Sequence, residues 1–84
     1  MLPVEISAEA AQFLQGLPAR FARQIDERIR RLSVVPFPAT SGKLHGTTDV
    51  YRVRQGAYRI LYRVRRQPGV LVIEAIGDRK DIYR

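Results

Sequence analysis

The 84-residue chain has no cysteine and no tryptophan, and it contains one histidine and one methionine. Without cysteine there can be no disulfide framework, no thiolate nucleophile and no cysteine-ligated zinc. Apolar stretches are also short: none approaches the roughly 18 residues of a membrane-spanning helix, and the amino terminus lacks the pattern of a secretory signal. We therefore expect a soluble, cytoplasmic protein with a single domain over residues 1–84.

Lysine is scarce as well, because thirteen of the fifteen basic residues are arginine. Residues 1–27 hold two cations and four acids, whereas residues 28–84 hold thirteen cations and four acids, which together give a net charge of +7. This asymmetry favours a polyanionic partner, such as nucleic acid, a ribosome or an acidic protein segment. The alternative is a solvated basic face that serves only solubility.

The amino-terminal half has the pattern of a strand followed by two helices. Alternating apolar residues over 2–6 predict a short strand, and the hydroxyl of Ser7 can cap the helix that follows. Apolar residues then recur at three- and four-residue steps in two segments separated by Gly16 and Pro18. The second segment has a buried stripe of Phe21, Ala22, Ile25, Ile29 and Leu32.

The carboxyl-terminal half begins with a loop and continues as strands. Residues 36–49 show no periodicity, and a loop of this length in so small a domain is usually functional or mobile. Three strands are expected over about 50–54, 58–65 and 70–76, with turns at 55–56 and 67–69.

Six arginines fall in residues 51–66, and the residues between them are mostly β-branched, aliphatic or aromatic. This alternation predicts a hairpin with one apolar face, formed by Tyr51, Val53, Tyr58, Ile60, Tyr62 and Val64, and one cationic face, formed by Arg52, Arg54, Arg59, Arg63 and Arg65. Guanidinium groups are planar and permanently charged, so an array of them is suited to holding phosphates.

The position of the turn decides which arginines oppose each other. A two-residue loop at Gln55-Gly56 would place Arg52 directly opposite Arg59. Like charges so placed cost stability, and an anion between them would relieve that cost, so the pair predicts an anion site. A four-residue loop would keep the same two faces, whereas a three-residue loop would not.

The order of the expected elements and several short motifs resemble those of a known family. The order of its elements and four motifs are similar to the RelE/ParE superfamily of toxins from type II toxin-antitoxin modules; the motifs are Lys43-Leu44-His45-Gly46, Tyr51-Arg52-Val53-Arg54, Gly56-Ala57-Tyr58-Arg59-Ile60-Leu61-Tyr62 and Ile76-Gly77-Asp78-Arg79-Lys80-Asp81-Ile82-Tyr83. The resemblance implies a small α+β fold of order β-α-α-β-β-β, an antiparallel sheet with both helices packed on one face. It also implies a cognate antitoxin that wraps and silences the chain.

Within the superfamily the RelE branch resembles the chain best, and its members cut messenger RNA in the ribosomal A site. The resemblance implies a ribosome-dependent endoribonuclease whose partners are the ribosome and mRNA, with no metal or other cofactor. The family's catalytic positions fall on Arg52, Arg54, Arg59, Arg79 and Tyr83. Further contacts to RNA or the ribosome are expected from Lys43, His45, Arg63, Arg65 and Lys80.

One departure from the family bears on the mechanism. RelE itself has lysines at the positions of Arg52 and Arg54, and a lysine can act as a base whereas an arginine effectively cannot. The base is then left to Tyr83, to His45 or to a ribosomal group. Two other functions stay open: a ParE-like inhibitor of DNA gyrase with no nuclease activity, and an inactive relative that binds only antitoxin or nucleic acid.

Overall fold

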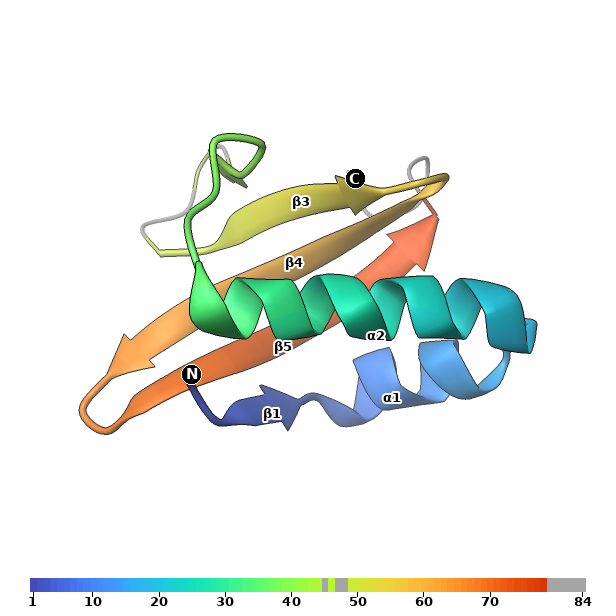
Figure 1. Ribbon diagram of the computed structural model, residues 1–84, viewed down its shortest axis with the longest axis horizontal. Coiled ribbons are helices and arrows are strands. Elements are labelled where there is room, and N and C mark those ends of the chain that lie inside the picture. The colour runs from blue at the N-terminus through green and yellow to red at the C-terminus, as the bar shows by residue number, and fades with distance from the viewer. Residues whose placement is uncertain (45, 47–48, 79–84) are drawn as a thin grey trace.

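A computed structural model describes residues 1–44, 46 and 49–78 of the chain. Two helices and five strands follow one another in the order β1 (Val4–Ile6), α1 (Ala8–Gln15), α2 (Ala19–Val34), β2 (Gly42–Lys43), β3 (Tyr51–Gln55), β4 (Tyr58–Arg66) and β5 (Gly69–Asp78). The strands form one sheet in the order β1-β5-β4-β3-β2 (Figure 1). The predicted α+β class is confirmed.

The sheet differs from the prediction in two respects. It is mixed rather than wholly antiparallel, because β1 pairs in parallel with β5, with Val4 opposite Leu71 and Ile6 opposite Ile73. The expected loop over residues 36–49 also contains β2, which pairs antiparallel with β3 at the outer edge of the sheet. An alternating pattern cannot reveal a strand's direction, and a two-residue strand is too short to show alternation.

Both helices begin and pack as their sequences indicate. The Ser7 hydroxyl caps α1 by accepting a hydrogen bond from the backbone N–H of Ala10 at 3.0 Å, and it donates to the carbonyl of Glu74 at 2.8 Å. The second hydrogen bond ties the start of α1 to β5. Three residues of the predicted α2 stripe, Ile25, Ile29 and Leu32, are buried.

The core lies between the helices and one face of the sheet. Ala10 and the three buried α2 residues pack there against strand residues Val53, Ile60, Tyr62, Leu71, Ile73 and Ile76. Phe13 of α1 and Phe21 of α2 both contact the ring of Tyr58, with centroid distances of 5.9 and 6.0 Å, so the two helices cover the same face. Figure 1 shows α2 lying across β4 and β5 with α1 beside it. The opposite face of the sheet is called the open face below.

The hairpin turn is one residue further along than predicted. Gln55 lies opposite Tyr58, so Gly56 and Ala57 form the turn. Gly56 has a φ of 61°, which glycine tolerates best, and glycine at the first central position is typical of a type II′ turn. The prediction that Arg52 opposes Arg59 is therefore wrong: Arg54 lies opposite Arg59, and Arg52 lies opposite Leu61.

The error shifts the pairing by two residues and so leaves the two faces of the hairpin unchanged, because side chains alternate with a period of two. Val53 and Ile60 are buried in the core, which places Arg52, Arg54 and Arg59 on the open face. The cost of opposed cations, predicted for one pair, applies to the pair Arg54 and Arg59 instead.

A β-bulge interrupts the pairing of β4 with β5. Leu61 lies opposite Ala75 but Tyr62 lies opposite Ile73, which leaves Glu74 as an extra residue in β5. The bulge allows both Ile73 and Ile76 to face the core, although they are three residues apart. Beyond the bulge the small residues Ala75 and Gly77 share the open face with the arginines of the hairpin.

Candidate nucleic-acid interface

Three arginines from two adjacent strands gather on the open face. Arg54 is exposed, Arg52 is half-buried and Arg59 is only 9% exposed. Across the sheet from Arg59 lies Gly77, and across from Leu61 lies Ala75, so the β5 residues at these two ladder positions are small. Arg52, Arg54 and Arg59 are called the arginine cluster below.

The conformation of Arg52 depends on its neighbour in β2. Its Nη1 donates to the carbonyl of Lys43 at 3.4 Å. Gly42 lies opposite Arg52, and a Cβ at position 42 would stand 3.0 Å from Nη1 and 3.3 Å from Cζ of that guanidinium. Only glycine thus lets the guanidinium lie against β2 without displacement. Lys43, a predicted RNA contact, is exposed on the same short strand.

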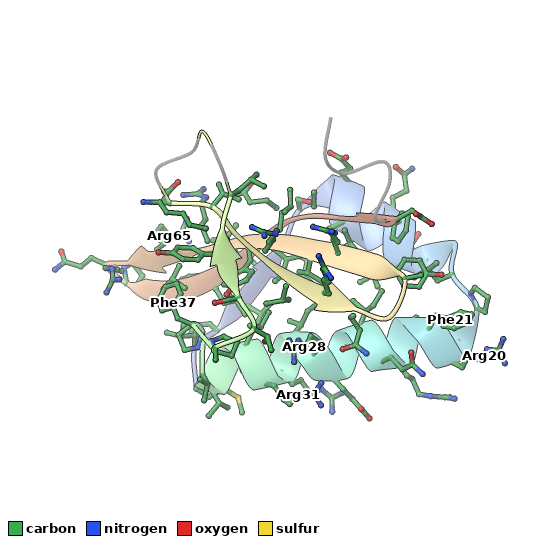
Figure 2. All side chains as sticks on the ribbon, turned by 90° about the horizontal axis from the view of Figure 1, so that it is seen from above. Arg20, Phe21, Arg28, Arg31, Phe37 and Arg65 are labelled. Atoms are coloured by element: carbon green, nitrogen blue, oxygen red, sulfur yellow. The ribbon has the colours of Figure 1, made fainter. Side chains whose placement is uncertain are left out.

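The remaining two arginines of the open face have carboxylate partners. Arg63 pairs through Nε with Oε1 of Glu74, the bulge residue, and this pairing raises the pKa of Arg63. Nη2 of Arg65 lies 2.6 Å from Oε2 of Glu5 in β1. Figure 2 shows Arg65 near the β4–β5 turn. Both were predicted RNA or ribosome contacts, and the structure places them in ion pairs that link β4 to β5 and β1.

The tyrosines of the hairpin lie on the other face, as expected from their alternation with Val53 and Ile60. Tyr62 is completely buried, and its hydroxyl donates to the carbonyl of Pro36 at 2.6 Å. Burial raises the pKa of Tyr62, and a hydrogen bond with Ser41 acts in the opposite direction. Tyr51 packs against Phe37 with a centroid distance of 4.7 Å. These rings therefore belong to the core rather than to a base-stacking surface.

Four predicted site residues, His45, Arg79, Lys80 and Tyr83, lie outside the described residues. Over residues 1–44, 46 and 49–78, no three His, Cys, Asp and Glu side chains come together in a way that could hold a metal ion. No helix in that part of the chain is long and apolar enough to cross a membrane.

Two residues that the sequence did not single out lie close to the arginine cluster. Arg28 of α2 and Thr40, from the segment before β2, line a groove of about 370 Å³ together with Arg52, Val53 and Arg54. Arg28 Nη2 donates to Thr40 Oγ1 at 2.9 Å. In the sequence Arg28 is one of five arginines on α2, and no periodicity distinguishes it from the others.

Comparisons with known proteins show the family to which this fold belongs. A family model described as the ParE toxin of the type II toxin-antitoxin system parDE matches residues 4–83. The chain is 31% identical over 84 residues to the protein named toxin RelE1 in Methanocaldococcus jannaschii, with coverage of 96% of this chain and 93% of the relative. It therefore belongs to the RelE/ParE superfamily of toxins from type II toxin-antitoxin systems.

Solved structures of toxins from the same superfamily share the fold of this chain. The crystal structure of the archaeal RelE-RelB complex from Pyrococcus horikoshii contains a chain with a TM-score of 0.81 and 32% identity, covering 95% of this chain and 97% of that one. The RelBE2 toxin-antitoxin complex from Mycobacterium tuberculosis contains a chain with a TM-score of 0.81 and 26% identity, covering 93% of this chain and 98% of that one. These relatives carry RelE names, whereas the family model is described as ParE.

Proposed function

We propose that this toxin is a ribosome-dependent endoribonuclease that cuts messenger RNA and so inhibits translation. The observation that carries the proposal is the arginine cluster: Arg52, Arg54 and Arg59 project from β3 and β4 onto the open face, which the helices leave uncovered. A cationic sheet surface of this kind matches the negative charge of an RNA backbone. Similarity to RelE-named relatives supports the same conclusion.

The chemistry proposed for this surface is an internal transesterification. The 2′-oxygen of one nucleotide forms a bond to the adjacent phosphorus, and the bond from phosphorus to the 5′-oxygen of the next nucleotide breaks. The proton of the 2′-hydroxyl passes to a base, and the leaving 5′-oxygen takes up a proton. Negative charge grows on the nonbridging oxygens, where fixed guanidinium groups stabilise the transition state more than the ground state.

Arginine side chains would supply the charge stabilisation that a metal ion provides in other nucleases. We assign this role to the arginine cluster and to Arg79, and proton transfer to Tyr83. Arg52 and Arg54 act as electrostatic stabilisers and not as bases, because a guanidinium stays protonated.

A cognate antitoxin is the proposed protein partner, because the similar RelE chains from Pyrococcus and Mycobacterium were crystallised in complexes with their antitoxins. The end of α2 offers a suitable surface. A groove of about 520 Å³ there is lined by apolar residues that include Leu32, Val34 and Val35, and by Arg28, Arg30 and Arg31. Val34 and Val35 are 60% and 56% exposed, so an amphipathic segment with acidic residues would bury apolar area and pair with these arginines.

The alternative is inhibition of DNA gyrase without hydrolysis, and the ParE description of the family model is the observation in its favour. One assay separates the two functions. In a purified translation system we expect cuts at A-site codons that disappear when ribosomes are omitted. Intact message together with inhibited gyrase supercoiling would favour the ParE-like function. A chain that does neither and still binds antitoxin would be an inactive relative.

A single variant tests the assigned carboxyl-terminal clamp. Arg79→Ala should abolish cutting while leaving antitoxin binding nearly intact, since the antitoxin is expected to hold mostly apolar surface. Arg23→Ala removes an exposed arginine of α2 that has no role in the proposed site, so it is the control and should retain the cutting activity. Cutting by Arg79→Ala at the rate of the unmodified chain would remove Arg79 from the mechanism.

A further inference from the structure

The groove beside the arginine cluster lies where the edge of the sheet meets α2. Within the described residues, β2 pairs with β3 only at Tyr51 and Arg52, so the outer side of β3 has no neighbouring strand from Val53 to Gln55. The groove opens at this edge, and its five lining residues come from α2, from the segment before β2 and from β3. Figure 2 shows Arg28 on the side of α2 that is turned toward the sheet, with Arg31 on the opposite side.

Three of the five lining residues are arginine, and none is acidic. Arg52 and Arg54 reach the groove from the open face, and Arg28 reaches it from the helix side. The groove therefore lies in a region of converging positive charge. Its volume of about 370 Å³ falls within the range of small-ligand sites.

Arg28 has hydrogen-bonding capacity that the described residues do not use. Its Nη2 is bound to Thr40, but its Nε is buried and has no hydrogen-bond partner there. A buried donor on a charged group that lacks an acceptor is destabilising, because the group has lost its hydration without gaining a hydrogen bond. An anion at the groove would supply that acceptor, and the planar guanidinium can bind a phosphate through two parallel hydrogen bonds.

We propose that this groove binds a backbone phosphate of RNA next to the phosphate that is cleaved. Arg28 and Thr40 are then positioning residues, and Arg52 and Arg54 lie between the two phosphates. The inference rests on the proposed nuclease function, because it takes the arginine cluster to be the site of cleavage. RNA is favoured over an acidic protein segment because the groove is continuous with that cluster through Arg52 and Arg54.

The first experiment needs neither ribosomes nor cutting. Inorganic phosphate is titrated into the purified chain while the Nε–H resonances of its arginines are followed by nuclear magnetic resonance. The Arg28 resonance, assigned by its loss in Arg28→Met, should shift in a saturable manner, and the shift should weaken in Thr40→Val. Arg23 is exposed on α2 and lines none of the grooves described above, so Arg23→Met is the control and should leave the response unchanged. No response at Arg28 Nε to phosphate would overturn the proposal.

The second experiment identifies the partner and uses short single-stranded RNA in which one phosphate at a time is replaced by a neutral methylphosphonate. Replacing the phosphate next to the cleaved one should weaken RNA binding by the unmodified chain and by Arg23→Met. The same replacement should not weaken RNA binding by Arg28→Met any further. Arg28→Met should itself lower affinity several-fold and reduce the slope of log K against log salt by about one.

Two results would contradict this inference. One is equal sensitivity to methylphosphonate in Arg28→Met and the unmodified chain. The other is a shift of Arg28 Nε by an acidic peptide at lower concentration than by RNA, which would assign the groove to a protein partner. Absence of ribosome-dependent cutting together with an Arg28-dependent phosphate response would reject the nuclease function and leave the anion site intact.

Discussion

The two ends of the open face carry the same residue type but use it differently. Near the β4–β5 turn, Arg63 and Arg65 are neutralised by Glu74 and Glu5. At the other end, the β5 residues that lie opposite Arg59 and Leu61 are Gly77 and Ala75. The difference arises from the neighbouring strands and not from the arginines themselves. Carboxylates of β5 and β1 hold Arg63 and Arg65 in structural ion pairs, whereas the small residues opposite Arg59 and Leu61 add little bulk to the face that carries the arginine cluster.

The largest expected difference between the two ends is in catalysis. Arg52→Met should reduce ribosome-dependent cutting by about 10²-fold or more, because it removes a fixed cation from the growing charge on the phosphate. Arg65→Met removes the same group from the ion-paired end and should change the rate by no more than about twofold, since exposed ion pairs contribute little. Primer extension on cut messages measures both rates. Equal losses would mean that the whole face acts as one surface.

A smaller effect is expected on the opposite face of the hairpin, where a change to a buried tyrosine should alter stability and not catalysis. Tyr62→Phe should cost about 0.5–1.5 kcal/mol of unfolding free energy at neutral pH, because the hydrogen bond to the Pro36 carbonyl is lost. Burial raises the pKa of Tyr62, so its neutral form is favoured in the folded state. The corresponding stability is fully present below the ordinary pKa of 10.0 and is lost as the pH rises through the higher pKa of the folded state.

Denaturation with urea at neutral pH and at pH values above 10 provides the measurement. The loss of stability on going to alkaline pH should be smaller in Tyr62→Phe than in the unmodified chain, whereas Tyr51→Phe, the control, should keep most of that loss. An alkaline loss that is unchanged by Tyr62→Phe would show that other groups control the high-pH stability.

The smallest expected effects are on folding stability, and they differ in sign between the two ends of the open face. Arg54→Gln should leave the fold unchanged or stabilise it by up to about 1 kcal/mol, because Arg54 lies opposite another cation, Arg59. Arg65→Gln should destabilise by at most about 1 kcal/mol, because it breaks the exposed pair with Glu5. Chemical denaturation of the two variants under the same conditions tests this. A clear loss of stability in Arg54→Gln would indicate that the opposed cations carry no cost.

Much of this architecture could be predicted from local patterns. Periodicity identified both helices, Ser7 marked the start of α1, and alternation assigned each hairpin residue to its face. The position of the turn was less certain, because Gly56 can serve as either the first or the second turn residue, and the two choices give the same alternation. The sequence therefore predicted that arginines oppose each other but assigned Arg52 in place of Arg54.

Features that depend on distant parts of the chain could not be predicted. Alternation over residues 2–6 indicated a strand but not its parallel partner β5, which lies more than 60 residues away in the sequence. The pairing of Arg63 with Glu74 depends on the bulge, and no local pattern marks it. The groove at Arg28 depends on where the segment containing Thr40 passes α2. The predicted roles of Arg79, Lys80, Tyr83 and His45 stay predictions.

The extra residue in β5 lies outside the alternation of the strand. Ile73 lies opposite Tyr62 and Ala75 lies opposite Leu61, so a chain without Glu74 would pair with β4 as a regular ladder. Ile76 would stay in the core and Ala75 and Gly77 would stay on the open face, but Arg63 would lose its counterion. The inserted amino acid thus serves one structural cation and not the arrangement of the two faces, and shortening β5 at this point would release Arg63 without moving the arginine cluster.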